Sequence, residues 1–164
     1  MKNDTRQHQE FLQMLRQCEG TIVKVCLCFT NRQADEIRDL YQEIACTLWE
    51  AWPSFRGDSD PNTWVTSIAL NVAAQEKRRR KQLPQFVELD ESLYDSLADE
   101  ASDQRYRRLY ELIDRLGDED RKLLFLYLDR KRLREIAKMT GYSETAVKQR
   151  LYRIKKKLIA LNKD

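Results

Sequence analysis

The sequence is poor in residues that break helices and has no long apolar run. It contains four glycines and three prolines in 164 residues, while 35% of its residues are charged. This composition favours amphipathic helices over strands. No apolar run approaches the ~20 residues of a membrane-spanning helix, and the first residues, MKNDTRQHQE, are too polar for a signal peptide. We therefore expect a cytoplasmic, all-α protein that does not insert into a membrane.

Residues that usually carry catalysis are also scarce. The single histidine, His8, lies in the polar N-terminal stretch. We find no Ser-His-Asp or Cys-His arrangement and no glycine-rich phosphate loop in the sequence. The sequence therefore predicts a protein that is not an enzyme and that uses no cofactor or metal.

Four cysteines are present, Cys18, Cys26, Cys28 and Cys46. The pair Cys26 and Cys28 could begin a metal site, but the sequence offers no second pair and no nearby histidine. Disulfides are rare in the cytosol. We therefore favour reduced thiols that act as small core residues.

The net charge is only +3, but the charges are strongly segregated. Residues 77–81, KRRRK, are all basic, and residues 83–104 hold seven acids with no Lys or Arg. Residues 148–157 hold no acid, and their basic residues are Lys148, Arg150, Arg153, Lys155, Lys156 and Lys157. Two separated basic patches indicate two contacts with one polyanion.

Two blocks with helical periodicity are separated by the acidic stretch. The first block is typical of three or four helices, including one over about 9–29 and one over about 34–52. Residues 83–103 have a proline, many acids and weak periodicity, which indicates a linker. Residues 104–164 return to strong helical patterning. The sequence thus predicts two small helical domains joined by an acidic linker.

A third helix of the first block should begin after the polar loop FRGDSDPN. Asp60 is placed to cap this helix, and Pro61 suits its first position. Trp64, Ile68 and Val72 then fall on one stripe, which favours Trp64 as a core residue. The helix ends in the basic run.

The second block starts with an apolar stripe that Gly117 closes. The stripe consists of Tyr106, Leu109, Tyr110, Ile113 and Leu116. Asp118 is then placed to cap a helix that contains the apolar segment LLFLYL.

The segment REIAKMTGYSETAVKQRLYRI has the pattern of a helix-turn-helix. Ile136 and the small Ala137 should face inward from its first helix. Gly141 supplies the backbone freedom that a tight turn needs. Ser143 can cap the second helix.

The second helix of this motif has an apolar face and a polar face. The apolar face holds Val147, Leu151, Ile154 and Leu158, and the opposite face holds Thr145, Gln149, Tyr152, Arg153 and Lys156, with Lys148 at its edge. Such polar side chains read base edges and phosphates in a major groove. A solvated basic face is the alternative, but the turn chemistry and the excess of cations favour DNA binding.

Two features of the first block each have a structural and a functional interpretation. The loop FRGDSDP, flanked by aromatic residues and followed by Asn71, could hold an unstacked base or could simply join two helices. Asn71 falls beside the buried stripe, and its position leaves both interpretations open. Trp49 lies toward the polar side of helix 34–52, so it either belongs to a protein interface or folds back onto the core.

Taken together, these motifs resemble a known family. The segments DLYQEI, FRG…TWVTSIALN and EIAKMTGYSETAVKQRLYRIKKKL, in this order and spacing, resemble bacterial sigma factors of the extracytoplasmic-function group within the sigma-70 family. By this resemblance residues 1–82 correspond to region 2, residues 83–103 to a linker and residues 104–164 to region 4. The segment YLDRKRLREIA departs from the pattern, because many relatives carry a Gly and a Ser/Thr-Tyr pair there.

The resemblance implies a role for each surface. Region 2 would dock on the clamp helices of core RNA polymerase through Asp39, Gln42, Glu43 and Trp49. It would recognise and melt the −10 element through Phe55, Arg56, Gly57, Asp58, Ser59, Asp60, Asn71, Lys77 and Arg78. Region 4 would bind the polymerase flap tip and read the −35 element through Thr145, Lys148, Gln149, Tyr152, Arg153 and Lys156. An anti-sigma factor would be a further partner.

The resemblance therefore predicts a promoter-specificity subunit of RNA polymerase. An alternative is a dimeric helix-turn-helix regulator that acts on duplex DNA without being a polymerase subunit, which would explain only residues 104–164. A helical interaction adaptor is a third possibility, and in that case neutralising Lys148, Arg153 and residues 77–81 would leave its activity intact.

Overall fold

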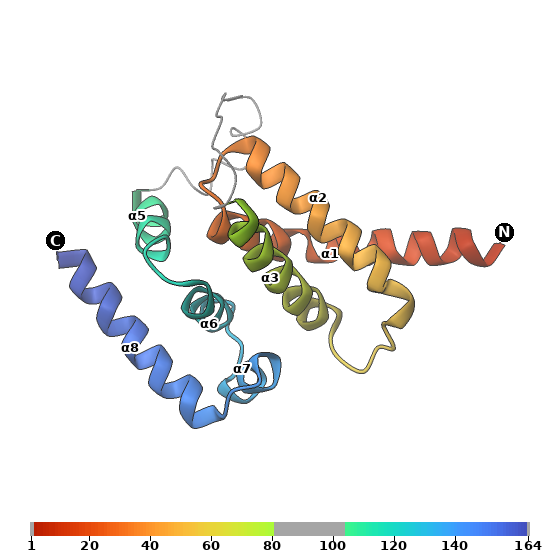
Figure 1. Ribbon diagram of the computed structural model, residues 1–164. Coiled ribbons are helices and arrows are strands. Elements are labelled where there is room, and N and C mark those ends of the chain that lie inside the picture. Colours follow the sequence, from red (N-terminus) through yellow and green to blue (C-terminus); the bar gives the residue numbers. More distant parts are fainter. Residues whose placement is uncertain (1, 81–103, 164) are drawn as a thin grey trace. The chain divides into compact units, whose positions relative to one another are not determined.

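The computed structural model describes residues 2–80 and 104–163 as helices and short connections, with no strand in these ranges (Figure 1). The chain divides into two compact units, 1–95 and 96–164. The expected all-α fold with two helical domains is confirmed. The predicted acidic linker, residues 83–103, lies outside the described residues, as do Lys81 and the side chain of Arg80. No helix in the described ranges is both long and apolar enough to cross a membrane.

The first unit is a three-helix bundle. Its helices are α1 (Lys2–Phe29), α2 (Ala34–Ala51) and α3 (Pro61–Arg80), with the short 3-10 helix η1 (Trp52–Ser54) after α2. Each of the three α-helices packs against the other two. Ile22, Ile44, Leu48 and Val65 are completely buried between them. Burial of each such side chain stabilises the fold by about 1.5–3 kcal/mol before entropy is counted.

The helix positions in this unit agree with the sequence except at three points. Helix α1 begins at Lys2 rather than near residue 9, and Trp52 belongs to η1 rather than to α2. The predicted stripe of α3 is correct only at Val72, which is buried. The fully buried residues of α3 include Val65, Ala69 and Ala73, whereas Trp64 and Ile68 are only half-buried. The buried arc is wide because α3 packs on both α1 and α2.

The second unit contains α5 (Gln104–Ile113), α6 (Asp118–Leu128), α7 (Leu133–Thr140) and α8 (Glu144–Lys163). Helix α8 packs on the other three helices. The central residues Leu123, Leu126, Ile136 and Val147 are buried. Here the expected cap at Asp118 was wrong: Gly117 occupies the N-cap position, and Asp118 is the first helical residue.

Asp118, Glu119 and Asp120 therefore form an acidic first turn of α6. Negative side chains are favourable there, because the helix dipole places partial positive charge at the N-terminus. Arg121 follows and is buried, with 3% of its surface exposed. Its guanidinium donates hydrogen bonds to the carbonyls of Asp114 (3.1 Å) and Leu116 (3.2 Å), which ties the end of α5 to the start of α6.

The basic segment that departs from the family pattern forms a compact connection between α6 and α7. Arg130 has a left-handed backbone (φ 60°), where glycine is the usual residue. Its N–H donates to the Tyr127 carbonyl, and the Lys131 N–H donates to the Leu126 carbonyl, both at 3.1 Å. The Glu135 carboxylate then accepts the Arg132 N–H at 2.8 Å and caps α7.

The turn between α7 and α8 has the predicted chemistry. Gly141 is left-handed (φ 77°), and its N–H donates to the Ala137 carbonyl at 2.9 Å. The Ser143 hydroxyl accepts the Ala146 N–H at 3.1 Å and so caps α8. Both predicted turn residues are therefore confirmed.

We expect Gly141→Ala to lower the free energy of unfolding by about 1 kcal/mol, because a left-handed backbone penalises a side chain and the lost freedom of the unfolded chain offsets only part of this cost. Gly20→Ala is the matched control. Gly20 is helical, and an added Cβ there would meet nothing within 4 Å. This control should raise stability by about 0.5–1 kcal/mol. Urea unfolding followed by circular dichroism measures both, and a shift in the same direction would contradict the turn geometry.

The four cysteines form no disulfide with one another, and not all of them are core residues. Cys18, Cys26 and Cys28 are buried, as predicted, whereas Cys46 is exposed on α2. Burial raises the pKa of the Cys18 thiol, and the nearby Asp60 carboxylate raises it further. Across the described ranges no group of three or more His, Cys, Asp or Glu residues is arranged to hold a metal ion.

One thiol should therefore react rapidly with a disulfide reagent such as DTNB in the native protein, and four should react after denaturation in guanidinium. The fast reaction should disappear in Cys46→Ser, because the three remaining thiols are buried and out of reach of the reagent. A fast native reaction of more than one thiol would mean that the first unit opens readily.

Candidate nucleic-acid interface

The predicted reading residues lie together on the outer face of α8. All six are exposed, namely Thr145, Lys148, Gln149, Tyr152, Arg153 and Lys156. On the opposite side Val147, Leu151 and Ile154 are buried against the unit. Tyr152 has 59% of its surface exposed, and the Lys156 ammonium lies over its ring, 4.7 Å from the centroid.

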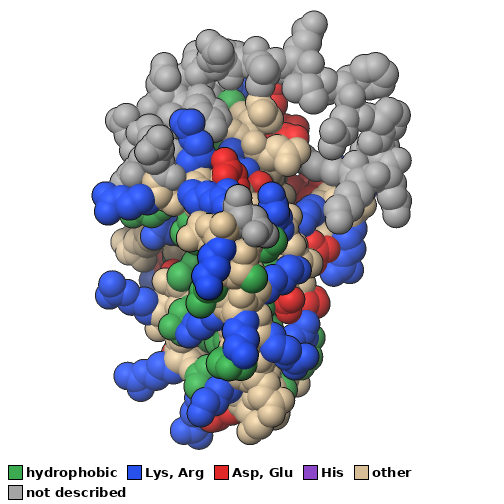
Figure 2. Space-filling model, turned by 90° about the vertical axis from the view of Figure 1, so that its left-hand side faces the viewer, with side chains coloured by type: hydrophobic (Ala, Val, Ile, Leu, Met, Phe, Trp, Pro, Cys, Tyr) green, Lys and Arg blue, Asp and Glu red, His purple; other side chains and the backbone are tan. Residues whose placement is uncertain are grey.

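Lys and Arg side chains are spread over the face of the second unit that Figure 2 shows. The α8 cations, however, are not equivalent. The Lys155 ammonium donates to the Tyr127 hydroxyl at 3.0 Å and lies 4.1 Å from the centre of that ring. The Lys157 ammonium donates to the Arg115 carbonyl at 3.4 Å. These two cations flank the outer face and are engaged within the unit, which the sequence pattern could not indicate.

Arg150 is a third cation of α8 that is engaged within the unit. Its guanidinium donates to the Asp120 carboxylate at 3.2 Å and lies 4.9 Å from the centre of the Tyr142 ring. Partial burial acts to lower the pKa of Arg150, but Tyr142 and Asp120 together raise it above its ordinary value. The guanidinium is therefore held as a cation beside the first turn of α6.

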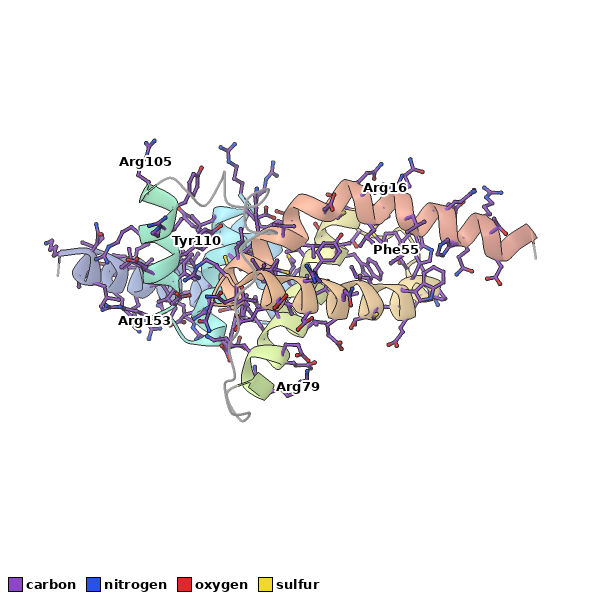
Figure 3. All side chains as sticks on the ribbon, turned by 90° about the horizontal axis from the view of Figure 1, so that it is seen from above. Arg16, Phe55, Arg79, Arg105, Tyr110 and Arg153 are labelled. Atoms are coloured by element: carbon purple, nitrogen blue, oxygen red, sulfur yellow. The ribbon has the colours of Figure 1, made fainter. Side chains whose placement is uncertain are left out.

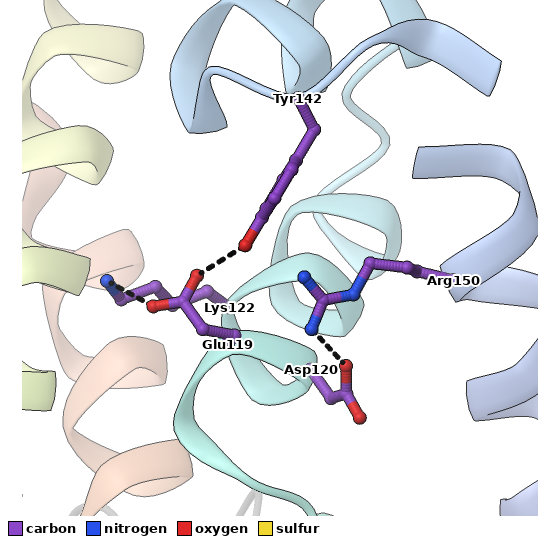
Figure 4. A network of polar contacts seen from close by, with 5 residues as sticks. All are labelled: Glu119, Asp120, Lys122, Tyr142 and Arg150. Carbon is purple, nitrogen blue, oxygen red and sulfur yellow. Dashed lines mark hydrogen bonds and ion pairs between the residues drawn. The ribbon is translucent and has the colours of Figure 1, made fainter. Parts of the chain in front are cut away.

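Tyr142 extends this set of contacts to a second acid. Its hydroxyl donates to the Glu119 carboxylate at 3.5 Å, and the Lys122 ammonium donates to the same carboxylate at 3.5 Å. We call Glu119, Asp120, Lys122, Tyr142 and Arg150 the Arg150 cluster (Figure 4). The sequence predicted none of the five as a site residue. Tyr142 is 23 residues from Glu119 along the chain, and Arg150 is 30 residues from Asp120, so local patterns do not reveal these pairs.

The polar loop of the first unit is anchored by aromatic rings. The Phe55 ring stacks on Trp52, with centroids 5.4 Å apart and planes 18° apart, and lies 4.8 Å from the Trp64 ring. Figure 3 shows Phe55 turned in among the helices of this unit. Trp64 therefore supports the loop, whereas the sequence favoured it as a core residue. The rest of the loop, residues 56–60, is exposed, and Gly57 has φ 75°.

The remaining residues predicted to contact the −10 element lie along α3. Asn71 and Arg78 are exposed, and Lys77 is half-buried. Asn71 follows Pro61 by ten residues, which places it about 15 Å along the helix from the loop. A ligand that contacts both the loop and Asn71 would have to extend over that length, as a nucleic-acid strand can.

The predicted docking face on α2 is exposed, and Trp49 is shared between this face and the core. Asp39, Gln42 and Glu43 are exposed, and Trp49 has 39% of its surface exposed. The covered side of the Trp49 ring packs edge-on against Phe11 (5.0 Å between centroids) and His8 (5.3 Å) of α1. Trp49 therefore packs in part on the core, and its exposed part leaves the interface interpretation as a prediction.

Phe11 connects this face to the aromatic rings of the loop. Its ring also lies 5.8 Å from Trp52, which stacks on Phe55. Phe11 falls within the predicted helix 9–29, but it was not identified as a core residue. The buried stripe of α1 was readable, since Phe11, Met14, Cys18, Ile22 and Val25 recur at helical spacing and are buried.

Two family models match the chain. Residues 14–82 match the model described as Sigma-70 region 2, and residues 106–158 match the model described as Sigma-70, region 4. The first match covers the bundle from the middle of α1 onward, with the loop, and the second covers most of the four helices of the second unit.

Two curated relatives are similar to this chain. One is the probable RNA polymerase sigma factor RfaY of Xanthomonas campestris, which is 23% identical over 154 residues, covering 88% of this chain but only 38% of that protein. The other is the ECF RNA polymerase sigma factor SigX of Bacillus subtilis, which is 26% identical over 139 residues, covering 77% of this chain and 71% of that protein.

Two solved structures share the fold. CnrH in complex with the cytosolic domain of CnrY is 19% identical, with a TM-score of 0.68 over 95% of this chain and 89% of that one. RpoE from Bartonella quintana, in complex with the anti-sigma factor NepR, is 18% identical, with a TM-score of 0.71 over 94% of this chain and 98% of that one.

Removal of the Phe55 ring should loosen the loop, because its contacts with Trp52 and Trp64 hold the loop to the bundle. In limited proteolysis of the folded protein, we expect Phe55→Ala to speed trypsin cleavage after Arg56 severalfold, since local opening of a segment exposes its backbone. Ser59→Ala, an exposed substitution in the same loop, is the control and should cleave at the wild-type rate. Equal rates for all three proteins would show that the rings do not anchor the loop.

Proposed function

Because this chain belongs to the sigma-70 family, in its extracytoplasmic-function group, we propose that it is a promoter-specificity subunit of RNA polymerase. It would bind the core enzyme, recognise −35 and −10 elements and start transcription. One observation carries the proposal: both DNA-recognition regions of the family match in order along one chain, each on its own compact unit. We assign residues 1–82 to region 2, 83–103 to the linker and 104–164 to region 4.

The −35 contact is proposed for the outer face of α8. Lys148, Gln149 and Arg153 offer hydrogen-bond donors and an acceptor to base edges and phosphates, and Tyr152 adds a ring. Thr145 and Lys156 lie on the same exposed face. A helix that presents such a face from a helix-turn-helix enters the major groove with its polar residues against the bases.

The −10 contact is proposed for the loop and the outer side of α3. Opening the duplex costs a few kcal/mol for each unstacked base, so the protein must supply that free energy through binding. A loop held by stacked rings loses little conformational freedom when it binds a strand, which leaves more of the contact energy for melting. Asn71, Lys77 and Arg78 would follow the displaced strand along α3.

Core polymerase is proposed to dock on α2. A partly exposed tryptophan on the same helix as exposed acidic residues, Trp49 with Asp39 and Glu43, has the composition of an interface centre and its polar rim. The clamp helices would bind there with Gln42, and the flap tip would bind region 4. The chain would act in the cytoplasm without enzymatic activity of its own, and an anti-sigma factor would be a further partner, as NepR is described to be for RpoE.

Reconstitution tests the proposal. Purified protein is added to bacterial core RNA polymerase with a fragmented genomic library, and run-off transcripts are sequenced. We expect specific transcripts that fall roughly tenfold to hundredfold with Arg153→Ala, the range for loss of a specific base or phosphate contact, and that also fall with Asn71→Ala. Lys24→Ala, an exposed cation on α1 outside the proposed surfaces, should transcribe normally.

Failure to bind core enzyme, together with dimeric footprints on duplex DNA, would contradict the sigma function and favour the regulator.

A further inference from the structure

Arg150 lies within the basic segment of α8, yet its surroundings differ from those of the reading residues. Its side chain is 28% exposed, and that of its partner Asp120 is 33% exposed. The reading residue Arg153, three positions later, is exposed and extends outward from the helix in Figure 3. The two arginines of one helix are therefore in different environments.

The helical positions explain the difference. At about 100° per residue, Arg150 lies on a flank of α8, between the buried stripe and the outer face. Lys157 follows seven residues later on the same flank, where its ammonium donates to the Arg115 carbonyl. This flank therefore faces the α5–α6 connection and the start of α6 rather than the direction in which the reading residues point.

The Arg150 cluster joins three separate parts of the DNA-binding unit. Asp120 and Glu119 belong to the first turn of α6, Tyr142 to the turn of the helix-turn-helix, and Arg150 to the second turn of α8. One hydrogen bond joins α6 to the turn and another joins α6 to α8 (Figure 4), while the ring contact joins the turn to α8. The contacts meet the end of α8 that carries Thr145, Lys148 and Gln149.

Such a partly exposed cluster contributes little to global stability, because solvent screens exposed ion pairs. Its main effect should be on the orientation of α8. The buried apolar stripe sets which side of α8 faces the unit, and the ion pair and the ring contact on one flank add directional contacts that oppose rotation about the helix axis. A small rotation moves every reading side chain relative to the base edges.

We propose that Arg150 is a positioning residue for −35 recognition and not a DNA contact. Asp120 and Tyr142 hold its guanidinium, and this fixes the rotation of α8 when its outer face enters the major groove. The inference rests on the proposed sigma function and goes beyond it, because it assigns an acidic residue of α6 a part in promoter selectivity.

The two possible roles of Arg150 give opposite results when Asp120 is neutralised. If Arg150 bound a phosphate, Asp120→Asn would release the guanidinium and remove a nearby negative charge, so DNA affinity would stay the same or rise. If Arg150 positions α8, Asp120→Asn must weaken recognition of the −35 element. Arg150→Ala alone does not separate these roles, since both predict a loss.

The experiment measures the binding of reconstituted holoenzyme to promoter fragments with an intact or a scrambled −35 element, over a range of salt concentrations. We expect Asp120→Asn and Arg150→Ala each to reduce the preference for the intact element by about threefold to tenfold. The double variant should lose no more of this preference than the single variant with the larger loss, because the two side chains act as one unit. Tyr142→Phe, which keeps the ring and removes only the hydroxyl, should lose about twofold.

The salt dependence provides a second readout that a simple loss of stability would not reproduce. Each phosphate contact contributes about one unit to the slope of log K against log salt concentration. The slope should therefore be unchanged in Asp120→Asn and Arg150→Ala, whereas Arg153→Ala should reduce it by about one. Glu111→Gln, which neutralises an exposed acid of α5 paired with Arg108, is the matched control for Asp120→Asn and should behave as wild type.

Wild-type or tighter promoter binding by Asp120→Asn would overturn the inference, as would a slope reduced by about one in Arg150→Ala. Thermal unfolding of each variant shows whether it is folded at the assay temperature. If Asp120→Asn or Arg150→Ala is not folded, the result for Tyr142→Phe decides the test. A wild-type holoenzyme that does not prefer the intact −35 element would instead contradict the proposed function, and this inference would fall with it.

Discussion

The proposed DNA-reading face depends on the burial of one apolar stripe. Val147, Leu151 and Ile154 are buried against the second unit, and this fixes which side of α8 faces solvent. Gly141 makes the turn that lets α7 and α8 pack closely. Once that packing is set, the residues opposite the stripe must point outward together, so the chemistry of the face follows from the spacing of apolar residues.

An equivalent relation holds in the first unit, where aromatic contacts join two proposed surfaces. Phe11 extends the buried stripe of α1 and packs on both Trp49 and Trp52. Trp49 belongs to the proposed docking face, and Trp52 stacks on Phe55 at the base of the loop. The rings therefore support both the proposed docking face and the polar loop.

Local signals in the sequence predicted the helices and the turn, whereas contacts between residues distant in the sequence were not predicted. Gly141 and Ser143 were identified because their chemistry is set by near neighbours. The buried arc of α3 includes Val72 of the predicted stripe but is wider than predicted, since two helices pack on α3 at once. The charge pattern of the sequence also did not distinguish Arg150 and Lys155 from the other cations of α8. Their partners in and beyond α6 are distant in sequence, so only the folded structure separates cations that are available to DNA from those that are engaged.

Strand opening is the property that distinguishes a sigma subunit most directly from a duplex-binding regulator. The decisive measurement is permanganate reactivity of unpaired thymines in a promoter, with this chain and core RNA polymerase added separately and together. A sigma subunit should make thymines of the −10 element reactive only when both components are present. Protection of duplex DNA at two symmetric half-sites by the chain alone, with no reactive thymines when core enzyme is added, would contradict the assignment.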